Sequence, residues 1–394
     1  MASFAGLRGT GDWGTDERPK NFREYILWRR PNGSAPLTAL MARMKKEKTD
    51  DPEFSWWEEE LNIIRVFSAT GLSATSTTLT IASGGLSLVK GDVLLVEKTE
   101  TATYDNEHVM VSSVTSDTVI EVIRGVAGTT AAITGVNVYL THIGSAYGEG
   151  TNSPDVTSRN PTKLSNFCQI FKTAYEETAT TNETRARTGP AKKNDKIRRS
   201  FDHSRSLETR WMFGVPFETT GTNGKPLRFT GGLRHFITTN VKIYTTTPTE
   251  DVFLDDVYKI FDYDAGNAGT ERLVFAGNGA LNALNKMARL SSSTRVNFNG
   301  SIKAYGMELQ RWILPQGTLY VRTHPLMNQH ARYTNSMFII DPSGIRYRPL
   351  RDTRPMENIQ ANDADTEKGQ WLTEAGLEVN HEKTMGYLGN FTVP

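Results

Sequence analysis

Few residues of this 394-residue chain have the types and spacing that catalysis or cofactor binding requires. Gly277-Asn278-Gly279 follows a short apolar run and precedes a helical pattern, as small residues do where a phosphate approaches a helix N-terminus. The third glycine of a dinucleotide fingerprint is absent, because Asn282 occupies its place. The spacing therefore favours an ordinary turn between a strand and a helix.

Acidic residues gather in two further places. Asp363, Asp365 and Glu374 have the spacing of oxygen ligands in a calcium loop, but Lys368 occupies the position of the sharp-turn glycine. We interpret this segment as a solvated loop that makes contacts. Residues 58–60 are three consecutive glutamates, which could supply an acid–base pair. Adjacent residues of a helix diverge, however, so these side chains would not face one another.

The histidines and the cysteine do not indicate a catalytic or metal site. The seven histidines show no metal-binding spacing. The only cysteine, Cys168, lies in an apolar strand pattern at 167–171, where a packed thiol is expected. A lone cysteine also excludes an intrachain disulfide. We therefore predict no catalytic residue, no cofactor site and no metal site, and we do not expect an enzyme.

The composition points to packing rather than chemistry. Lys and Arg number 45 against 44 Asp and Glu, which excludes a strongly basic protein that coats nucleic acid. At 43.9 kDa the chain exceeds the usual size of one core, so two or three packed units are expected. The sequence has no run of eighteen apolar residues and no signal-peptide pattern, so we expect no membrane span and a location in the cytoplasm or in a particle assembled there.

The first 62 residues have the composition of an arm. Residues 1–35 are rich in glycine and charge and cannot bury a core alone, and a short helix is expected at about 37–46. Their aromatic residues are nevertheless too numerous for an idle linker. We therefore predict an arm that docks on something, and we single out five of its aromatic side chains as contact residues: Trp13, Phe22, Trp28, Trp56 and Trp57.

Residues 66–143 have a different composition. Ser and Thr occupy 22 positions, proline is absent, and the net charge is −4. Short apolar runs alternate with turn signals, which predicts a small barrel or sandwich inserted in the chain. The expected strands are Thr77–Ile81, Val93–Glu97, Val109–Val114, Val119–Ile123 and Val136–Leu140.

The longest helical pattern runs from Ala191 to about Phe213. Its apolar stripe is expected to contain Ile197, Phe201, Ser204, Leu207 and Trp211. Residues 185–210 carry a local charge of +6, which the neutrality of the whole chain conceals. This charge is sufficient for nonspecific attraction to phosphate, and the basic residues considered are Lys192, Lys193, Lys196, Arg198 and Arg199.

The remaining patterns mix strands and helices, which predicts an α+β fold. Helices are expected at 251–261 and 280–290. Strands are expected at 167–177, 272–276, within 302–321, and at 337–340, 345–350 and 377–379, with a charged segment before the last.

Two blocks of sequence resemble the major capsid (head) proteins of tailed bacteriophages. The first runs from Pro36 to Leu61 and includes the segment Asp51-Pro52-Glu53-Phe54-Ser55-Trp56-Trp57. The second contains Ile340-Asp341-Pro342, residues 348–353, Asn358-Ile359-Gln360, Asp363, Asp365 and Leu372-Thr373-Glu374-Ala375-Gly376-Leu377-Glu378-Val379. The resemblance covers most of the chain from Pro36 and is weak in residues 66–143.

The resemblance implies the capsid fold shared by tailed phages and herpesviruses, with a small all-β domain inserted. It assigns residues 1–62 to the N-terminal arm and 63–189 to an extended loop that carries the insertion. It assigns 190–249 to a peripheral domain with the spine helix at 190–213, 250–335 to an axial domain, and 336–394 to C-terminal strands of the peripheral domain.

The function implied is a major capsid protein that self-assembles into pentamers and hexamers of an icosahedral head around double-stranded DNA. The implied location is the virion, assembled in the cytoplasm of the host bacterium. The implied partners are other copies, a separate scaffolding protein, a portal protein, a decoration protein and DNA bound nonspecifically by the basic helix. A phage tail or decoration protein is the alternative, and a carbohydrate-active enzyme would need a pair of carboxylates about 5–10 Å apart.

Overall fold

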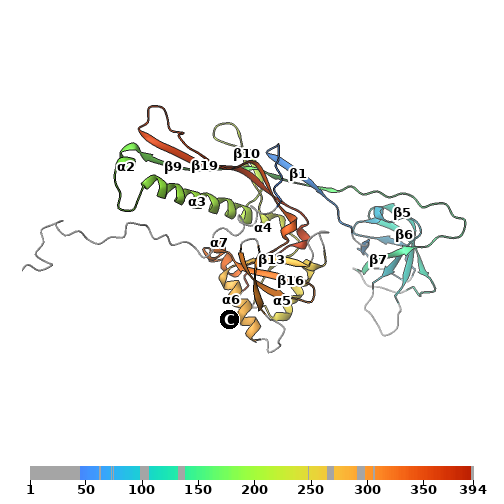
Figure 1. Cartoon of the computed structure of the whole chain (residues 1–394). Helices are drawn as coiled ribbons and strands as arrows, with labels where there is room; N and C mark the ends of the chain where they lie inside the picture. Colours follow the sequence, from blue (N-terminus) through green and yellow to red (C-terminus); the bar gives the residue numbers. More distant parts are fainter. Residues whose placement is uncertain are drawn as a thin grey trace, which may run out of the picture. The chain divides into compact units, whose positions relative to one another are not determined.

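The computed structural model describes residues 45–391, apart from 62, 63, 72, 74, 98–105, 132–137, 247, 264–269, 291–297, 305 and 306. The helix expected at 37–46 lies almost wholly outside these residues. The chain divides into two compact units (Figure 1). Unit 2 is Trp57–Lys163, and unit 1 comprises the remainder. The chain leaves unit 1 through β1 (Glu53–Glu58) and returns through β8 (Thr162–Phe167), and these two strands pair.

Unit 2 is the predicted β unit, and its sheet closes on itself. The strands described are β2 (Arg65–Ser68), β3 (Thr78–Thr80), β4 (Asp92–Val96), β5 (His108–Ser116), β6 (Val119–Val126) and β7 (Val138–Ser145). They pair antiparallel in the order β2-β7-β4-β5-β6-β3. A bridge between Ser68 and Ile81 joins the two ends of this order, and Ala82 N donates to Phe67 O at 2.8 Å. The unit is therefore a small barrel.

The inward side chains of the barrel alternate with outward ones, as strand geometry requires. Leu94, Val109, Val111, Ile120 and Leu140 are fully buried in its core. The five strands expected from the sequence are confirmed. The extra strand β2 was not expected, because its four residues are too few to show an alternating pattern.

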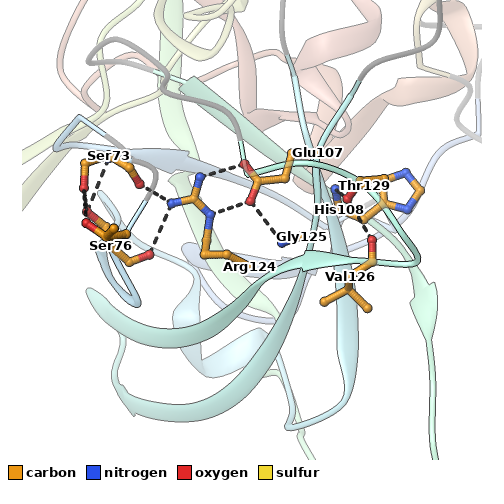
Figure 2. A network of polar contacts seen from close by, with 9 residues as sticks. Ser73, Ser76, Glu107, His108, Arg124, Gly125, Val126 and Thr129 are labelled. Carbon is orange, nitrogen blue, oxygen red and sulfur yellow. Dashed lines mark hydrogen bonds and ion pairs between the residues drawn. The ribbon is translucent and has the colours of Figure 1, made fainter.

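One ionic network fastens the loops of the barrel to its strands (Figure 2). Arg124 in β6 forms a two-pronged pair with Glu107, with nitrogen–oxygen distances of 2.5 and 2.6 Å. Both side chains are buried. The same guanidinium donates to the backbone oxygens of Ser73 and Ser76, and Glu107 accepts from the backbone nitrogen of Gly125. The guanidinium and the carboxylate of this pair are thus both hydrogen-bonded on several sides, as buried charges require.

Unit 1 contains a three-stranded antiparallel sheet in the order β18-β19-β9. Its strands are β18 (Ile345–Met356), β19 (Thr366–Val379) and β9 (Gln169–Thr178). Helix α3 (Ala191–Phe213) runs along β9 and β19, and the short α2 (Ala179–Glu183) precedes it (Figure 1). The long helix expected from Ala191 to Phe213 is confirmed.

The second sheet of unit 1 has seven strands. In sheet order these are β12 (Val241–Ile243), β20 (Gly386–Gly389), β17 (Met337–Ile340), β13 (Glu271–Ala276), β16 (Thr318–Thr323), β15 (Met307–Ile313) and β14 (Phe298–Ala304). The central pair β13 and β16 is parallel, whereas β13 and β17 are antiparallel.

Both faces of this second sheet are covered, which explains why β13 is a continuous apolar run. Leu273 and Phe275 face one core, together with residues from the C-terminal end of α3 and from α4 (Leu233–Phe236). Val274 and Ala276 face the other core, together with residues from α5 (Glu250–Val257) and α6 (Asn278–Leu290). The helices expected at 251–261 and 280–290 are confirmed, with Tyr258–Phe261 forming a 3-10 turn after α5.

The remaining described elements are short. Strands β10 (Phe217–Thr220) and β11 (Pro226–Phe229) form a separate hairpin after α3. The short helix α7 (Pro325–Asn328) follows β16. Further 3-10 turns lie at Gly85–Ser87, Tyr333–Asn335, Pro342–Gly344 and Glu382–Thr384.

Strand pairing joins segments that the expected domain boundaries separate. Strands β17 and β20, within the expected C-terminal segment 336–394, lie in the seven-stranded sheet beside β13. Strand β9, within the expected extended loop of 63–189, lies in unit 1 and pairs with β19. Pairing between distant segments leaves no local pattern in the sequence, and the expected boundaries stay a prediction.

Candidate contact surfaces

Cys168 is a packed thiol, as the sequence predicted. It is buried with Phe54 and Trp56 against β1. Burial raises the pKa of the Cys168 thiol to about 12, with a smaller contribution from the nearby carboxylate of Glu374. The thiolate that a nucleophile requires is therefore not formed near neutral pH.

The Gly277-Asn278-Gly279 segment is the ordinary turn that its spacing favoured. A Cβ atom at Gly277 would overlap the backbone of Thr334, and one at Gly279 would overlap the Asn335 side chain. The backbone nitrogen of Asn278 already donates to Asn328 Oδ1 at 2.6 Å. The small residues thus permit close packing of β13 and α6 on the 334–335 segment and are not a phosphate cradle.

The calcium loop considered at 363–374 is excluded by its backbone. Strand β19 begins at Thr366, so Glu374 lies eight strand residues further on, roughly 26 Å at 3.3 Å per residue. Its carboxylate instead accepts from Arg351 Nε at 2.6 Å. Within the described ranges, no group of three His, Cys, Asp or Glu side chains is placed to hold a metal ion.

The basic residues of α3 have two different environments. Lys192 and Lys196 form ion pairs with Glu367 and Glu357, which lie at the ends of β19 and β18. These hydrogen-bonded partners raise the pKa of both lysines. The two carboxylates reduce the local charge of residues 185–210 from +6 to +4, a neutralisation that the sequence could not show.

The other predicted basic residues remain at the surface. Arg198 and Arg199 pair with Asp195 on their own helix, at 3.3 and 3.8 Å. Lys193 is exposed and has no ion pair within the described part of the chain. Exposed pairs of this kind contribute little to stability. Their cations thus remain available to a polyanion.

The predicted stripe of α3 is confirmed in part. Leu207 and Trp211 are buried and Ile197 is 38% exposed, while three residues outside the prediction are buried as well: His203, Glu208 and Met212. His203 hydrogen-bonds Thr173 Oγ1 at 3.1 Å and Thr373 Oγ1 at 2.8 Å, and burial lowers its pKa. Glu208 meets His324 Nε2 at 3.1 Å. Polar residues therefore anchor the helix to both sheets, and a hydrophobic pattern cannot reveal them.

The predicted arm contacts have separate outcomes. Trp56 is 9% exposed and packs on Phe54 and Phe236 of its own chain, so it is not a free contact for a neighbour. Trp57 is 64% exposed. Trp13, Phe22 and Trp28 lie outside the described residues.

The base of the arm also docks on its own chain, along β18. The backbone nitrogens of Glu47 and Thr49 donate to the carbonyls of Tyr347 and Pro349, at 3.1 and 3.2 Å. The Glu47 carboxylate pairs with Arg346 and Arg348, each at 2.8 Å. Partial burial would raise the pKa of Glu47, but hydrogen bonds from the two arginines hold it below its ordinary value.

The β10–β11 hairpin exposes an apolar face that sequence reasoning missed. Phe217 pairs with Phe229, and Thr219 pairs with Leu227, so these four side chains share one face. Phe217 and Leu227 are 59% and 45% exposed, although Arg210 lies over the Phe229 ring. The sequence Gly221-Thr222-Asn223-Gly224 is a turn signal, and the alternation on either side of it could have identified the hairpin.

These surfaces belong to a fold known from phage shells. The capsid of an empty GTA particle matches 98% of this chain and 100% of that chain, with 10% identity and a TM-score of 0.51. The capsid of Myoviridae phage XM1 matches 98% of this chain and 99% of that chain, with 8% identity and a TM-score of 0.45. The match to the GTA particle shows that the fold is a capsid fold.

A family model described as the SU10 major capsid protein matches residues 9–392, and the chain belongs to this family. The major capsid protein of Pseudomonas phage PaMx41 is 28% identical over 355 residues, which are 88% of this chain and 82% of that protein. The chain is accordingly a structural capsid protein of a phage virion that associates with its own copies, and it is not an enzyme. In the described residues, no helix is both long and apolar enough to cross a membrane.

Proposed function

We propose that copies of this chain form pentamers and hexamers that close into an icosahedral head around double-stranded DNA. Assembly takes place in the cytoplasm of the host bacterium, with a separate scaffolding protein and a portal protein, and the finished shell accepts a decoration protein. The family supports a capsid role, which disfavours the tail and carbohydrate-active alternatives. In this proposal residues 1–62 form the arm and the loop bearing unit 2 extends over a neighbouring copy.

The β10–β11 hairpin is the observation that supports contact between copies most directly. An isolated two-stranded hairpin is marginal in water, and three or more strands or a packed face are needed for stability. Among the residues that the structure describes, Arg210 lies over the Phe229 ring, whereas Phe217 and Leu227 stay 59% and 45% exposed. A second copy that covers this face would bury both side chains, which contributes about 1.5–3 kcal/mol for each one fully buried.

The hairpin offers a matched pair of variants. Phe217→Ser with Leu227→Ser removes the apolar face, whereas Glu218→Gln with Arg228→Gln removes an exposed ion pair on the opposite face. We expect the first variant to sediment as unassembled protein when it is coexpressed with the scaffolding protein. The second should assemble like the wild type. Normal shells from the apolar-face variant would show that this hairpin is not an assembly contact.

The exposed cations of α3 support the placement of DNA. Lys193, Arg198 and Arg199 are surface cations of α3, with the sign that a phosphate backbone attracts without reading its sequence. Lys192 and Lys196 contribute less than their charge suggests, because Glu367 and Glu357 already neutralise them. In the proposed shell the exposed side of α3 lies toward the interior.

A further inference from the structure

Unit 1 contains a polar pocket that neither the capsid role nor the basic helix accounts for. Its volume is about 510 Å³, and it lies where α4, β12, β17 and β20 meet the 3-10 turn at Tyr333–Asn335. Its lining includes Arg234, Ile243, Arg332, Tyr333, Ser336 and Tyr387. None of the lining residues is acidic.

Two guanidinium groups dominate the charge of this pocket. Arg234 lies over the Tyr387 ring at 4.7 Å, and its strongest polar contact is a 3.5 Å hydrogen bond to the Ile237 carbonyl. Arg332 is exposed at the rim. Neither arginine has an ion pair with any residue in the described ranges. Most arginine donors in the pocket thus have no anionic partner from the chain itself.

One wall of the pocket carries uncharged hydrogen-bonding groups. The Tyr387 hydroxyl hydrogen-bonds Ser336 Oγ at 3.2 Å, and both residues are buried. Burial raises the pKa of Tyr387, although Arg234 and Arg332 act in the opposite direction. The phenol therefore stays protonated and adds no negative charge. Tyr333 is held in place by stacking on Phe213, with ring centroids 4.3 Å apart.

We propose that this pocket binds a phosphate oxyanion between Arg234 and Arg332. Guanidinium groups present a planar fork of donors that matches phosphate oxygens, and charge-assisted hydrogen bonds of this kind are stronger than neutral ones. A pocket of this volume is large enough for a phosphate or pyrophosphate group. The phosphate comes either from a free oxyanion or from a nucleic-acid backbone, which present the same chemistry to the pocket.

Calorimetric titration of the full-length protein with pyrophosphate, in chloride buffer of low ionic strength, tests the proposal. We expect one binding event per chain. Arg332→Gln should weaken it by about tenfold or more, because it removes a charged hydrogen-bonding partner. Arg332→Lys keeps the charge but loses the planar fork of donors. Its affinity for pyrophosphate should fall between those of the wild type and Arg332→Gln. The control Lys172→Gln removes an exposed cation outside the pocket and should bind like the wild type.

Two further measurements complete the test. Arg332 is exposed, so its variants should have the melting temperature of the wild type. Arg234→Gln removes the other guanidinium of the pocket and provides a second binding variant. Competition with a 12-base-pair duplex identifies the source: displacement of pyrophosphate assigns the site to backbone phosphate, and failure to displace it assigns the site to a free oxyanion. The proposal is overturned if the wild type binds no pyrophosphate, or if Arg332→Gln and Arg234→Gln bind it as tightly as the wild type.

Discussion

Glu107 and Arg124 form a buried ion pair in the barrel of unit 2 (Figure 2). Both side chains are removed from water, which costs free energy that only complete pairing offsets. The pairing is complete here, because Arg124 also reaches two backbone carbonyls and Glu107 also accepts from Gly125. Removing only one of the two partners should therefore lower the stability of the barrel far more than removing both.

Arg124→Met should destabilise the barrel by about 3–5 kcal/mol, because it leaves the buried carboxylate of Glu107 without its counter-charge. The double variant Arg124→Met with Glu107→Leu should lose less than the single variant. Amide hydrogen exchange in β5 and β6 of the full-length protein measures the change. A loss below about 1 kcal/mol in Arg124→Met would contradict the assigned role.

A second prediction concerns pH at the base of the arm. The pKa of Glu47 lies below its ordinary value in the folded chain, so its pairs with Arg346 and Arg348 stabilise docking above that ordinary value. This stabilisation is lost as the pH falls from the ordinary value of 4.5 through the lower pKa of the folded state.

We therefore expect residues 46–49 to lose protection from amide exchange, relative to the intrinsic rate at each pH, or to become accessible to an acid protease on acidification. Glu47→Gln should show the same release at neutral pH and a weaker pH dependence. Equal acid release in the wild type and in Glu47→Gln would assign the effect to other groups, such as Asp352 paired with Lys46.

At the scale of elements, α3 is joined to its surroundings by polar contacts at both ends. Near its N-terminus, Lys192 and Lys196 reach the ends of β19 and β18. Further along, His203 bridges β9 and β19, and Glu208 meets His324 beyond β16. The helix thus connects the three-stranded sheet to the seven-stranded one.

Removing the carboxylates that face Lys192 and Lys196 should strengthen binding to DNA. In Glu357→Gln with Glu367→Gln both lysines become free to meet phosphates, so the slope of log affinity against log salt should steepen by about one for each lysine that binds a phosphate. Glu149→Gln, an exposed change in unit 2, should leave the slope unchanged. A slope equal to that of the wild type in the double variant would place this end of α3 away from DNA.

The elements differ in how far their sequence reveals them. Helix α3 and the strands of unit 2 have a regular apolar period, and the sequence predicted them with nearly correct bounds. Residues 351–376 were expected to be a charged segment, yet they lie largely in β18 and β19. Residues 351–355 of β18 are exposed throughout and residues 366–371 of β19 are mostly half-buried, so polar residues occupy them without alternation. Likewise, the sites of Glu47 and Glu208 depend on partners distant in sequence.

At the scale of the whole molecule, the near-neutral charge is an average over unlike surfaces. The net charge is +1, whereas residues 66–143 carry −4 and the α3 surface remains positive after its pairing with Glu357 and Glu367. The exposed apolar faces, at Trp57 and on the β10–β11 hairpin, match the needs of a chain that associates with its own copies. The chain belongs to a capsid family, and in the proposed shell neighbouring copies would cover these apolar faces.

Cryo-electron microscopy of the wild-type protein, coexpressed with its scaffolding protein, tests the central proposal most directly. We predict closed icosahedral shells built from pentamers and hexamers, with the Phe217 and Leu227 face of each hairpin covered by a neighbouring copy. Persistent monomers, or only trimers and open tubes, would contradict the account.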